Sequence, residues 1–343
     1  GWYFDVTTFP DYGKLAGRTI AQAEDGVSRI DESVAKRNKA DFVLWKYSHT
    51  RIHADKDADQ RGIKEPSWAS PIGKGRPGWH IEDTAITEKY FGPQYDIHGA
   101  GIDLMFPHHE AEIAQQESAS GKKPMVKIWM HAEFVLAGET KMSKSKGNFV
   151  TAREFLDHHS ANVFRLLVAQ HHYRSRIPLT NAVIEQAVNT LGTIQEFYEK
   201  LRHTRSKKYE LRSKKYPTPT SYFLDLTSFE QQFDVAMDDD LNTPEALAAI
   251  FALINDANPI IWNLPKAELK AIIQFLDTHL ALFGITIKPF KIPREIKQKV
   301  KARELFRTTQ QFIKADALRE ELEQLGYKVD DTPEGPLVLP KSK

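Results

Sequence analysis

The stretch Lys141-Met142-Ser143-Lys144-Ser145-Lys146-Gly147-Asn148-Phe149 is the most informative part of the chain, and it follows a segment of alternating strand and helix patterns. The lysine ammonium groups can neutralise phosphate charge, and the small polar side chains let backbone N–H groups approach a ligand closely. A solvated loop of the same composition is the alternative. Loops that serve a parallel α/β sheet lie at the carboxyl ends of its strands. The sequence therefore predicts an α/β domain with a polyphosphate-binding loop.

Strand and helix patterns extend outward from this loop in both directions. Upstream we expect a strand at 2–6, a long Gly- and Pro-rich loop at 60–79, a helix near 82–90, a strand reaching His98, a helix at about 106–119 and a strand near 126–136. From about residue 152 the apolar spacing is helical, with stripes at Ile184, Val188, Leu191, Tyr198, Leu201 and at Leu269, Ile272, Ile273, Leu276, Leu280, Phe283. Thr243 followed by Pro244 predicts a helix whose N-cap is Thr243.

The composition is that of a globular protein with two or three domains. Of the 343 residues, 41% are hydrophobic and 27% are charged, and no apolar run reaches the length of about 18 residues that a membrane span needs. The net charge of +1 means that binding to nucleic acid would depend on local basic patches. There are 0 cysteines, which excludes disulfides and thiolate metal ligands within the chain and fits a cytoplasmic location.

A short basic duplication separates two of the expected helices. Arg205-Ser206-Lys207-Lys208-Tyr209 is repeated as Arg212-Ser213-Lys214-Lys215-Tyr216. This run could follow an RNA backbone electrostatically, or it could be an ordinary solvated loop.

Several motifs along nearly the whole chain resemble one enzyme family. Among them are Gly78-Trp79-His80-Ile81-Glu82, His98-Gly99-Ala100-Gly101 and Phe106-Pro107-His108-His109-Glu110; the full set covers 12–15, 41–46, 73–82, 96–101, 106–110, 141–149, 173–175, 240–244 and 315–319. In this order they resemble the class I aminoacyl-tRNA synthetases, and within these the cysteinyl-tRNA synthetases. The resemblance implies ATP-dependent activation of cysteine and its transfer to tRNA(Cys), with ATP, L-cysteine and tRNA as partners of a monomer and with Mg²⁺ accompanying ATP.

The resemblance also implies a domain order. We expect the C-terminal part of a Rossmann-like class I catalytic domain at 1–150, a stem-contact segment at 151–180, an all-α anticodon-binding bundle at 181–287 and a small C-terminal domain at 288–343.

The family's nucleotide site can be placed residue by residue. The resemblance assigns contact with ATP to Lys144, supported by Lys141. It places the adenosine over His98, Gly99 and Gly101, where the absence of a Cβ lets a nucleoside lie against the backbone. The family has a third glycine where this chain has Ala100.

The resemblance assigns the amino-acid pocket to Trp79, as a wall, and to Asp103, as the carboxylate that binds the α-ammonium group. His108 and Glu112 lie four residues apart on an expected helix, so both project from one face. By resemblance they are zinc ligands, and zinc distinguishes a thiol from a hydroxyl. His109 is expected to point elsewhere. The family's cysteine ligand is replaced by Asp83, so either the metal persists with an oxygen ligand or it is lost.

Two further departures affect the activity. The chain has no His-x-Gly-His signature, and the family's early cysteine ligand is also missing. Since the chain begins with Gly1-Trp2 and not Met, we expect an upstream part that carries half of the ATP site. A ligase that joins cysteine to an amino-sugar and a non-catalytic tRNA-binding paralogue are the alternatives; the roughly 190 residues after the lysine loop count against the first.

Overall fold

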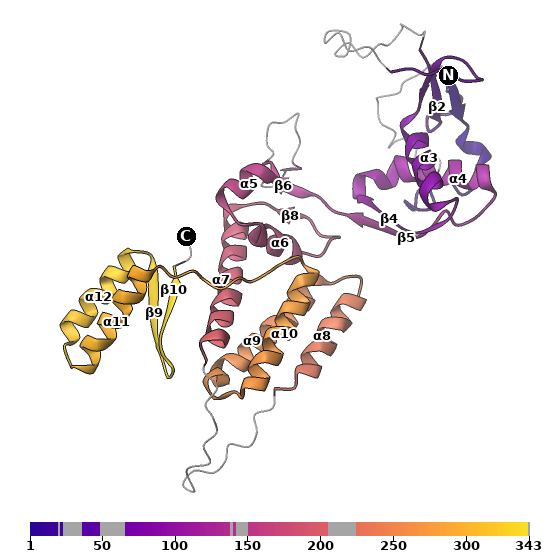
Figure 1. Ribbon diagram of the computed structural model, residues 1–343. Coiled ribbons are helices and arrows are strands. Elements are labelled where there is room, and N and C mark those ends of the chain that lie inside the picture. The colour runs from indigo at the N-terminus through magenta and orange to yellow at the C-terminus, as the bar shows by residue number, and fades with distance from the viewer. Residues whose placement is uncertain are drawn as a thin grey trace. The chain divides into compact units, whose positions relative to one another are not determined.

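The structure is a computed structural model that describes residues 1–19, 21–22, 36–48, 66–137, 140–141, 150–204 and 224–341. It divides into two compact units, Gly1–Phe134 and Val135–Lys343 (Figure 1). The basic duplication lies outside the described residues. No helix among the described residues is long and apolar enough to cross a membrane.

The first unit contains a small antiparallel sheet. Strands β1 (Trp2–Phe4), β2 (Phe42–Tyr47) and β3 (Gly75–Pro77) pair in that order, with Phe4 opposite Phe42 and Trp45 opposite Pro77. The chain then turns into a helix at Gly78, where a Cβ would stand 2.0 Å from the carbonyl oxygen of Val43. The sheet therefore requires glycine at this crossing. The alternating pattern predicts only parallel pairing, so this antiparallel sheet is an addition.

The same unit contains the parallel strand pair that the sequence predicts. Helix α3 (Trp79–Phe91) leads to β4 (Tyr95–Gly101), and α4 (Glu110–Ser120) leads to β5 (Val126–Ala132). Two short turns, η3 (Ile102–Leu104) and η4 (Met105–His109), join β4 to α4. Strands β4 and β5 run parallel from Tyr95 opposite Val126 to Gly101 opposite Ala132. Their carboxyl ends therefore open on the same edge.

The core of this unit places α4 against the aromatic residues of the antiparallel sheet. Ala111 and Ala114 are fully buried against Phe42 and Tyr12. Small side chains let the helix approach this sheet closely, and Phe42 stacks on Phe4 with ring centroids 5.0 Å apart. The next residues along α4 are thereby fixed relative to α3 and β4.

The second unit begins with a small mixed sheet and two helices. Strand β6 (Val135–Ala137) pairs antiparallel with β7 (Thr140–Lys141) and parallel with β8 (Ile177–Pro178). Helices α5 (Ala152–His158) and α6 (Ala161–Ala169) follow, and Thr151 and Glu154 form a reciprocal capping box at the start of α5. The predicted single strand near 126–136 is therefore two strands, β5 and β6.

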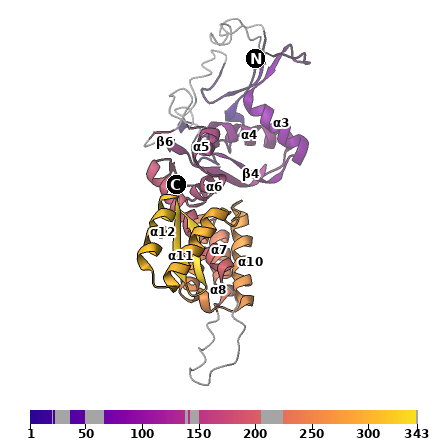
Figure 2. The ribbon, with the colours of Figure 1, turned by 60° about the vertical axis from the view of Figure 1, so that its left-hand side comes forward.

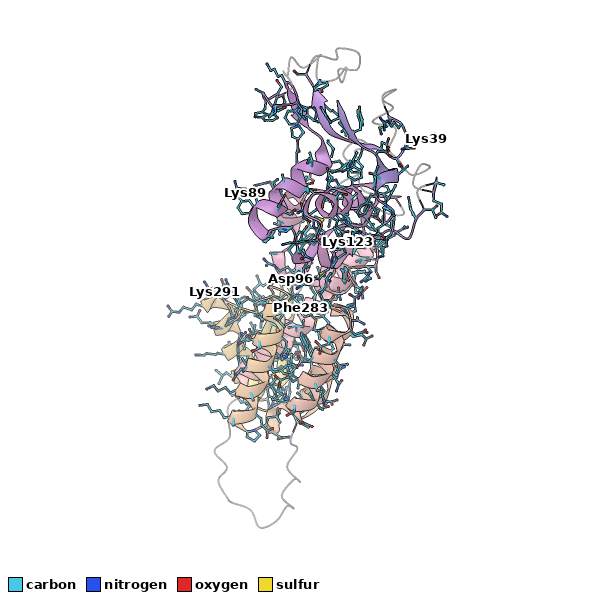
Figure 3. The ribbon with its side chains drawn as sticks, turned by 90° about the vertical axis from the view of Figure 1, so that its right-hand side faces the viewer. Lys39, Lys89, Asp96, Lys123, Phe283 and Lys291 are labelled. Atoms are coloured by element: carbon cyan, nitrogen blue, oxygen red, sulfur yellow. The ribbon has the colours of Figure 1, made fainter. Side chains whose placement is uncertain are left out.

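The largest core of the chain belongs to a helical bundle. It consists of α7 (Asn181–His203), α8 (Leu226–Asp238), α9 (Thr243–Ala257), a 3-10 segment η6 (Asn258–Asn263) and α10 (Lys266–Leu282), which stand side by side in both views (Figures 1 and 2). Both predicted stripes lie in this core, and only Ile184, Val188, Ile273 and Phe283 are partly exposed. Phe283, which directly follows α10 and is labelled in Figure 3, packs against this core. The apolar periodicity thus identified the helical core.

The predicted start of α9 is one residue late. Asn242, not Thr243, is the N-cap, and its side chain accepts a hydrogen bond of 3.3 Å from the backbone N–H of Glu245. Asp240 and Leu241 before it take left-handed conformations with φ of 54° and 55°. The turn that presents the cap therefore begins earlier than the Thr-Pro pair indicates.

A small α/β subdomain completes the described chain. Helices α11 (Arg294–Thr308) and α12 (Phe312–Gln324) pack on a hairpin of β9 (Tyr327–Thr332) and β10 (Gly335–Pro340). Arg303 is 3% exposed and donates to both carboxylate oxygens of Asp331 at 2.8 and 2.9 Å. This bidentate pair ties the first helix to the hairpin.

Candidate functional site

The predicted metal residues converge at the carboxyl-end edge of β4 and β5. The Nε2 atom of His108 lies 2.8 Å from Oδ2 of Asp83 and 2.7 Å from Oε1 of Glu112. Asp83 comes from the first turns of α3, whereas His108 and Glu112 come from the turn before α4 and from its first turn. The ligand atoms of the three side chains all lie within 4.8 Å of one another. The i and i+4 spacing thus presents two donors, and α3 adds the third.

The side chain of Glu112 is buried without hydrogen-bond partners. The residue is fully buried, and neither carboxylate oxygen has a hydrogen-bond partner, so the short contact of Oε1 with His108 lacks hydrogen-bond geometry. In the described part of the chain it is the only carboxylate for which both oxygens are buried and unpartnered. An unpaired buried carboxylate destabilises a protein strongly, whereas a bound cation removes that cost. These residues therefore fit a divalent metal ion.

A second histidine holds the ring of His108 in place. This second histidine is His80, whose Nδ1 lies 2.6 Å from Nδ1 of His108, so one of the two nitrogens must donate a hydrogen atom. When His108 donates, its Nε2 presents a lone pair to the carboxylates, which is the tautomer that a metal ligand needs. Burial, and secondly the charge of His108, lowers the pKa of His80 to about 4, so His80 is neutral near pH 7. Trp79 covers this pair, with its ring 4.3 Å from that of His108.

Another donor group shares Glu112 from the opposite direction. His98, His109 and Glu112 also place their ligand atoms within 4.8 Å of one another. His109 therefore points into the site from its other side, although the sequence predicts that it points elsewhere. Burial, followed by the charges of His98 and His131, lowers the pKa of His109 to about 3, which keeps the imidazole neutral.

The second donor group has its own supporting residues. Nδ1 of His109 lies 2.8 Å from Nε2 of His131, and the hydroxyl group of Tyr95 lies 2.6 Å from Nδ1 of His98. The indole of Trp129 packs against both the ring of His98 and the ring of His109, with centroid distances of 4.8 and 4.9 Å. Sequence reasoning missed His80, His131, Tyr95 and Trp129. The available signal was their position on the same elements as the predicted residues: His80 lies at the start of α3, Tyr95 begins β4, and Trp129 and His131 lie on β5.

The glycine residues near the end of β4 differ in what they require. A Cβ on Gly101 would stand 2.8 Å from Oδ1 of Asp103, so glycine lets this carboxylate fold back toward the strand. At Gly99 the nearest atom would be 3.9 Å away and the backbone is not left-handed, so the fold itself does not need a glycine there. Space of this kind suits a flat ligand that lies on the backbone. Asp103 is exposed, as a substrate-binding carboxylate must be.

The lysine loop is described only at its start. Lys141 ends strand β7, which pairs with β6, whereas Lys144 lies outside the described residues. Side-chain contacts in the first unit bring together Trp79, Asp83, His98, His108 and Glu112, and Gly99, Gly101 and Asp103 follow His98 along the chain.

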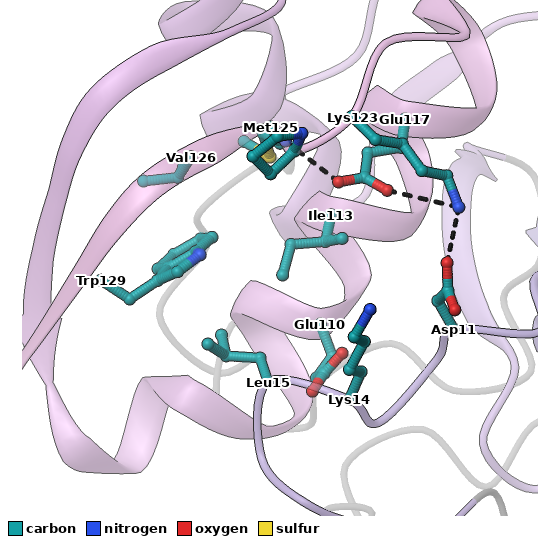
Figure 4. A pocket seen from close by; sticks show the side chains of 11 residues that line it. Asp11, Lys14, Leu15, Glu110, Ile113, Glu117, Lys123, Met125, Val126 and Trp129 are labelled. Atoms are coloured by element: carbon teal, nitrogen blue, oxygen red, sulfur yellow. Dashed lines mark hydrogen bonds and ion pairs between the residues drawn. The ribbon is translucent and has the colours of Figure 1, made fainter.

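A separate cavity of about 410 Å³ lies on another face of α4 (Figure 4). Its charged walls already have structural partners: Glu110 accepts hydrogen bonds from the backbone N–H groups of Gly13 and Ala16, and Lys123 pairs with Asp11 at 2.6 Å. None of the predicted site residues lines this cavity, although Trp129 separates it from the histidine rings. The predicted site residues lie around the strand ends, not around this cavity.

Comparison with known proteins gives two family matches. Residues 1–189 match the family described as tRNA synthetases class I (C) catalytic domain, and residues 232–288 match the DALR domain. A cysteine--tRNA ligase of Thermococcus onnurineus is 37% identical over 344 residues, covering 98% of this chain and 69% of the relative. The chain belongs to the cysteine--tRNA ligase family.

Other cysteine--tRNA ligases agree with this membership. The enzyme of Nitratidesulfovibrio vulgaris strain Hildenborough is 38% identical over 356 residues, which cover 97% of the chain and 70% of that relative. Among solved structures, the LeuRS–tRNA–LeuAMS complex of Agrobacterium radiobacter K84 is similar over 69% of the chain, with a TM-score of 0.42 and 12% identity. That likeness is too slight to bear on the fold. The predicted family and the α/β-then-helical fold class are confirmed by the family matches.

Proposed function

We propose that the protein is a cysteine--tRNA ligase, which activates L-cysteine with ATP and transfers the cysteinyl group to tRNA(Cys). Membership of the family carries this proposal. The DALR domain at 232–288 favours it over an amino-sugar ligase, because an enzyme that acts on a small sugar does not need a helical tRNA-binding end. We also propose a cytoplasmic monomer and the domain limits 1–150, 151–180, 181–287 and 288–343.

The proposed chemistry needs positioning and charge neutralisation more than a side-chain nucleophile. A carboxylate oxygen of cysteine attacks the α-phosphorus of ATP, an O–P bond forms, and the bond to the bridging oxygen breaks as pyrophosphate leaves. Lys141 and Lys144 would neutralise the phosphate charge that develops. Mg²⁺ bound to ATP supplies further neutralisation of that charge.

The strand-end residues would hold the two substrates. The adenosine would lie against Gly99 and Gly101 beside His98, where the fold leaves the backbone of Gly99 accessible. The exposed carboxylate of Asp103 would bind the α-ammonium group, a charge-assisted contact that orients the attacking carboxylate. Trp79, which is 57% exposed over His108, would close the pocket around the side chain.

The metal residues would select the thiol. Asp83, His108 and Glu112 would hold Zn²⁺, and the two unpartnered oxygens of Glu112 support a cation at this place. Bound zinc supplies a partner that prefers a thiolate to a hydroxyl group. Asp83 is a harder donor than the cysteine of the family, but aspartate is an established zinc ligand.

The proposal is tested by exchange of pyrophosphate into ATP and by charging of tRNA(Cys), on the protein expressed from the complete gene. Both activities should depend on cysteine. The Lys144→Ala variant should lose on the order of 10²-fold in exchange or more, because it removes a charge that stabilises the transition state. Lys291→Ala, a change at an exposed lysine in the second unit, is the matched control.

Three outcomes would contradict the proposal. Exchange without charging of tRNA, together with transfer to an amino-sugar, would favour the other ligase. Tight tRNA binding with no exchange would favour the non-catalytic paralogue. Full exchange in Lys144→Ala would remove the lysine loop from the mechanism.

A further inference from the structure

The linker between helices α10 and α11 crosses helix α7 (Figure 1). Residues 285–293 of this linker have no regular secondary structure, and its two ends are held by different cores. Ile285 and Ile287 are buried in the core of the bundle, whereas Ile292 packs against the core of the small subdomain. The path of the linker between these anchors therefore determines how the subdomain is attached to the bundle.

One face of α7 binds the backbone of the linker. Glu199 and Arg202 lie three residues apart, so their side chains project from the same side of the helix. Nη2 of Arg202 donates a hydrogen bond of 3.0 Å to the carbonyl oxygen of Ile287, and Oε1 of Glu199 accepts one of 3.2 Å from the backbone N–H of Phe290. These two side chains thus take up backbone groups of the linker that have no partner in a helix or a strand.

Glu199 and Arg202 also bind each other. Nη1 of Arg202 donates at 3.0 Å to the same Oε1 atom of Glu199 that accepts from Phe290. The guanidinium lies over the ring of the fully buried Tyr198, with its Cζ 5.0 Å from the ring centroid. The side chains are 14% and 27% exposed, so solvent screens this charge-assisted contact only in part. We call Glu199 and Arg202 the linker clamp.

The first helix after the linker presents a row of cations. Arg294, Lys297 and Lys301 of α11 are exposed, and their spacing places them on one helix face. Within the described residues no ion pair involves these three, whereas Lys299 and Arg303 of the same helix pair with carboxylates of the subdomain. A row of exposed lysine and arginine side chains suits the phosphate groups of a nucleic-acid backbone.

We propose that the linker clamp positions the cationic face of α11 against the phosphate backbone of tRNA. Glu199 and Arg202 are then positioning residues, because they bind the linker and not the RNA. A subdomain that is already held in place loses less conformational freedom when RNA binds, so the complex is tighter. This inference rests on the proposed function, in which tRNA is a substrate.

Charging kinetics test the clamp on the protein expressed from the complete gene. Glu199→Ala and Arg202→Ala should each raise the KM for tRNA(Cys) about three- to tenfold, because the released linker must be ordered again in the complex. Pyrophosphate exchange does not involve tRNA and should keep its kcat and its KM for cysteine. A general loss of structure would lower both activities, so a defect confined to tRNA identifies a positioning role.

Three further variants sharpen the test. The double variant of Glu199 and Arg202 should be no worse than the worse single variant, since the two residues act as one unit. Glu199→Gln keeps an acceptor oxygen and should lose less than Glu199→Ala. Lys200→Ala is the matched control: it breaks a 2.8 Å ion pair with Glu196 on the same helix that makes no hydrogen bond to residues 285–293, and it should leave the KM for tRNA unchanged.

Two direct measurements separate the linker from the cationic face. Hydrogen exchange in residues 285–293 should be faster in Glu199→Ala than in the wild type, because the N–H group of Phe290 loses its acceptor. Lys297→Ala and Lys301→Ala should each reduce the dependence of log K for tRNA on log salt by about 1, as the loss of one phosphate contact does. Gln298→Ala, at a neutral exposed residue of α11, should not change this slope.

The outcomes distinguish this inference from the proposed function. An unchanged KM for tRNA in Arg202→Ala, equal losses of exchange and charging, or unchanged salt slopes in the two lysine variants would each overturn the inference. The ligase assignment stands if the wild type charges tRNA(Cys) in the same experiments. If the wild type binds tRNA without catalysing exchange, the ligase assignment falls, and the Kd for tRNA should still rise in the clamp variants.

Discussion

The helical bundle and the strand-end site bury polar side chains in opposite ways. In the bundle, the hydroxyl group of the buried Tyr198 donates to Asp277 at 2.8 Å, and Nδ1 of the buried His279 donates to the carbonyl oxygen of Phe275 at 2.7 Å. At the strand ends, the fully buried Glu112 has no hydrogen-bond partner for either oxygen. Satisfied polar groups belong to the fold, whereas an unsatisfied charge among donor atoms indicates a ligand. The buried core stabilises the second unit, whereas we expect the unpartnered carboxylate of Glu112 to cost the first unit stability unless a ligand is bound.

The largest expected effect comes from the core of the bundle. Ile250 is fully buried among the helices, so Ile250→Ala should lower the free energy of unfolding by about 2–5 kcal/mol through lost burial and a cavity. Chemical denaturation monitored by circular dichroism measures the change. Leu282→Ala, at a side chain that is 66% exposed on α10, is the control and should have little effect. Equal losses in both variants would contradict the placement of the core.

The next prediction is a substitution at a buried position that should raise the free energy of unfolding, whereas most such substitutions lower it. Glu112→Met replaces the buried, unpartnered carboxylate with an apolar side chain of similar size. In metal-free protein it should raise the free energy of unfolding by about 1–3 kcal/mol, because the desolvation cost of the charge disappears. Denaturation in the presence of a chelator tests this. A large loss of stability in Glu112→Met would mean that the carboxylate is already satisfied in the apoprotein.

The third prediction concerns the start of α9. Asn242→Ala should cost about 1 kcal/mol, because the side chain of Asn242 caps the backbone N–H of Glu245. Thr243→Ala is the matched variant and should cost less, since Thr243 lies inside the helix and its hydroxyl group makes only a 3.4 Å contact with the carbonyl oxygen of His171. Thermal unfolding of the two proteins distinguishes them. A larger loss of stability in Thr243→Ala than in Asn242→Ala would indicate that Thr243 is the N-cap, as the sequence predicts.

The smallest expected effect is a pH dependence in the second unit. Hydrogen bonds from Arg174 and then from Tyr173 lower the pKa of Asp240 to about 2. A carboxylate whose pKa is lowered in the folded state contributes stability above its unfolded value near 3.8, and this contribution is lost as the pH falls toward 2. In Asp240→Asn, the stability of this unit should therefore fall less steeply as the pH drops from about 3.8 to about 2. Hydrogen exchange of the turn before α9, followed against pH, measures it; an unchanged pH dependence would contradict the assigned partners.

Local rules predicted much of this molecule. The spacing of His108 and Glu112 predicted that the two side chains meet, although His108 lies in the turn before α4, and the apolar stripes identified the helices of the bundle. Each of these depends on neighbours a few residues away. The pairing of β1 with β2 is different: Phe4 lies opposite Phe42 across residues that carry no readable pattern. The contact between His80 and His108 spans 28 positions and depends on how α3 packs against α4. Local sequence patterns do not predict contacts between residues so far apart in the chain.

The start of α9 was missed for a local reason. Asn242 and Thr243 are both good caps, and the choice between them depends on the left-handed turn at Asp240 and Leu241. Neither residue is a glycine, so the sequence carries no signal for that turn. Polar contacts of Asp240 with Tyr173 and Arg174 hold it.

The contrast between the two units depends on whether the unpartnered carboxylate of Glu112 serves the purpose of binding a metal ion. Equilibrium dialysis of Zn²⁺ against the wild type and the Glu112→Gln variant tests that purpose most directly, because the substitution keeps the shape of the side chain and removes its charge. We expect one bound Zn²⁺ per wild-type chain and a loss of affinity of at least about tenfold in the variant. Equal binding by the two proteins would contradict a metal centre at Asp83, His108 and Glu112.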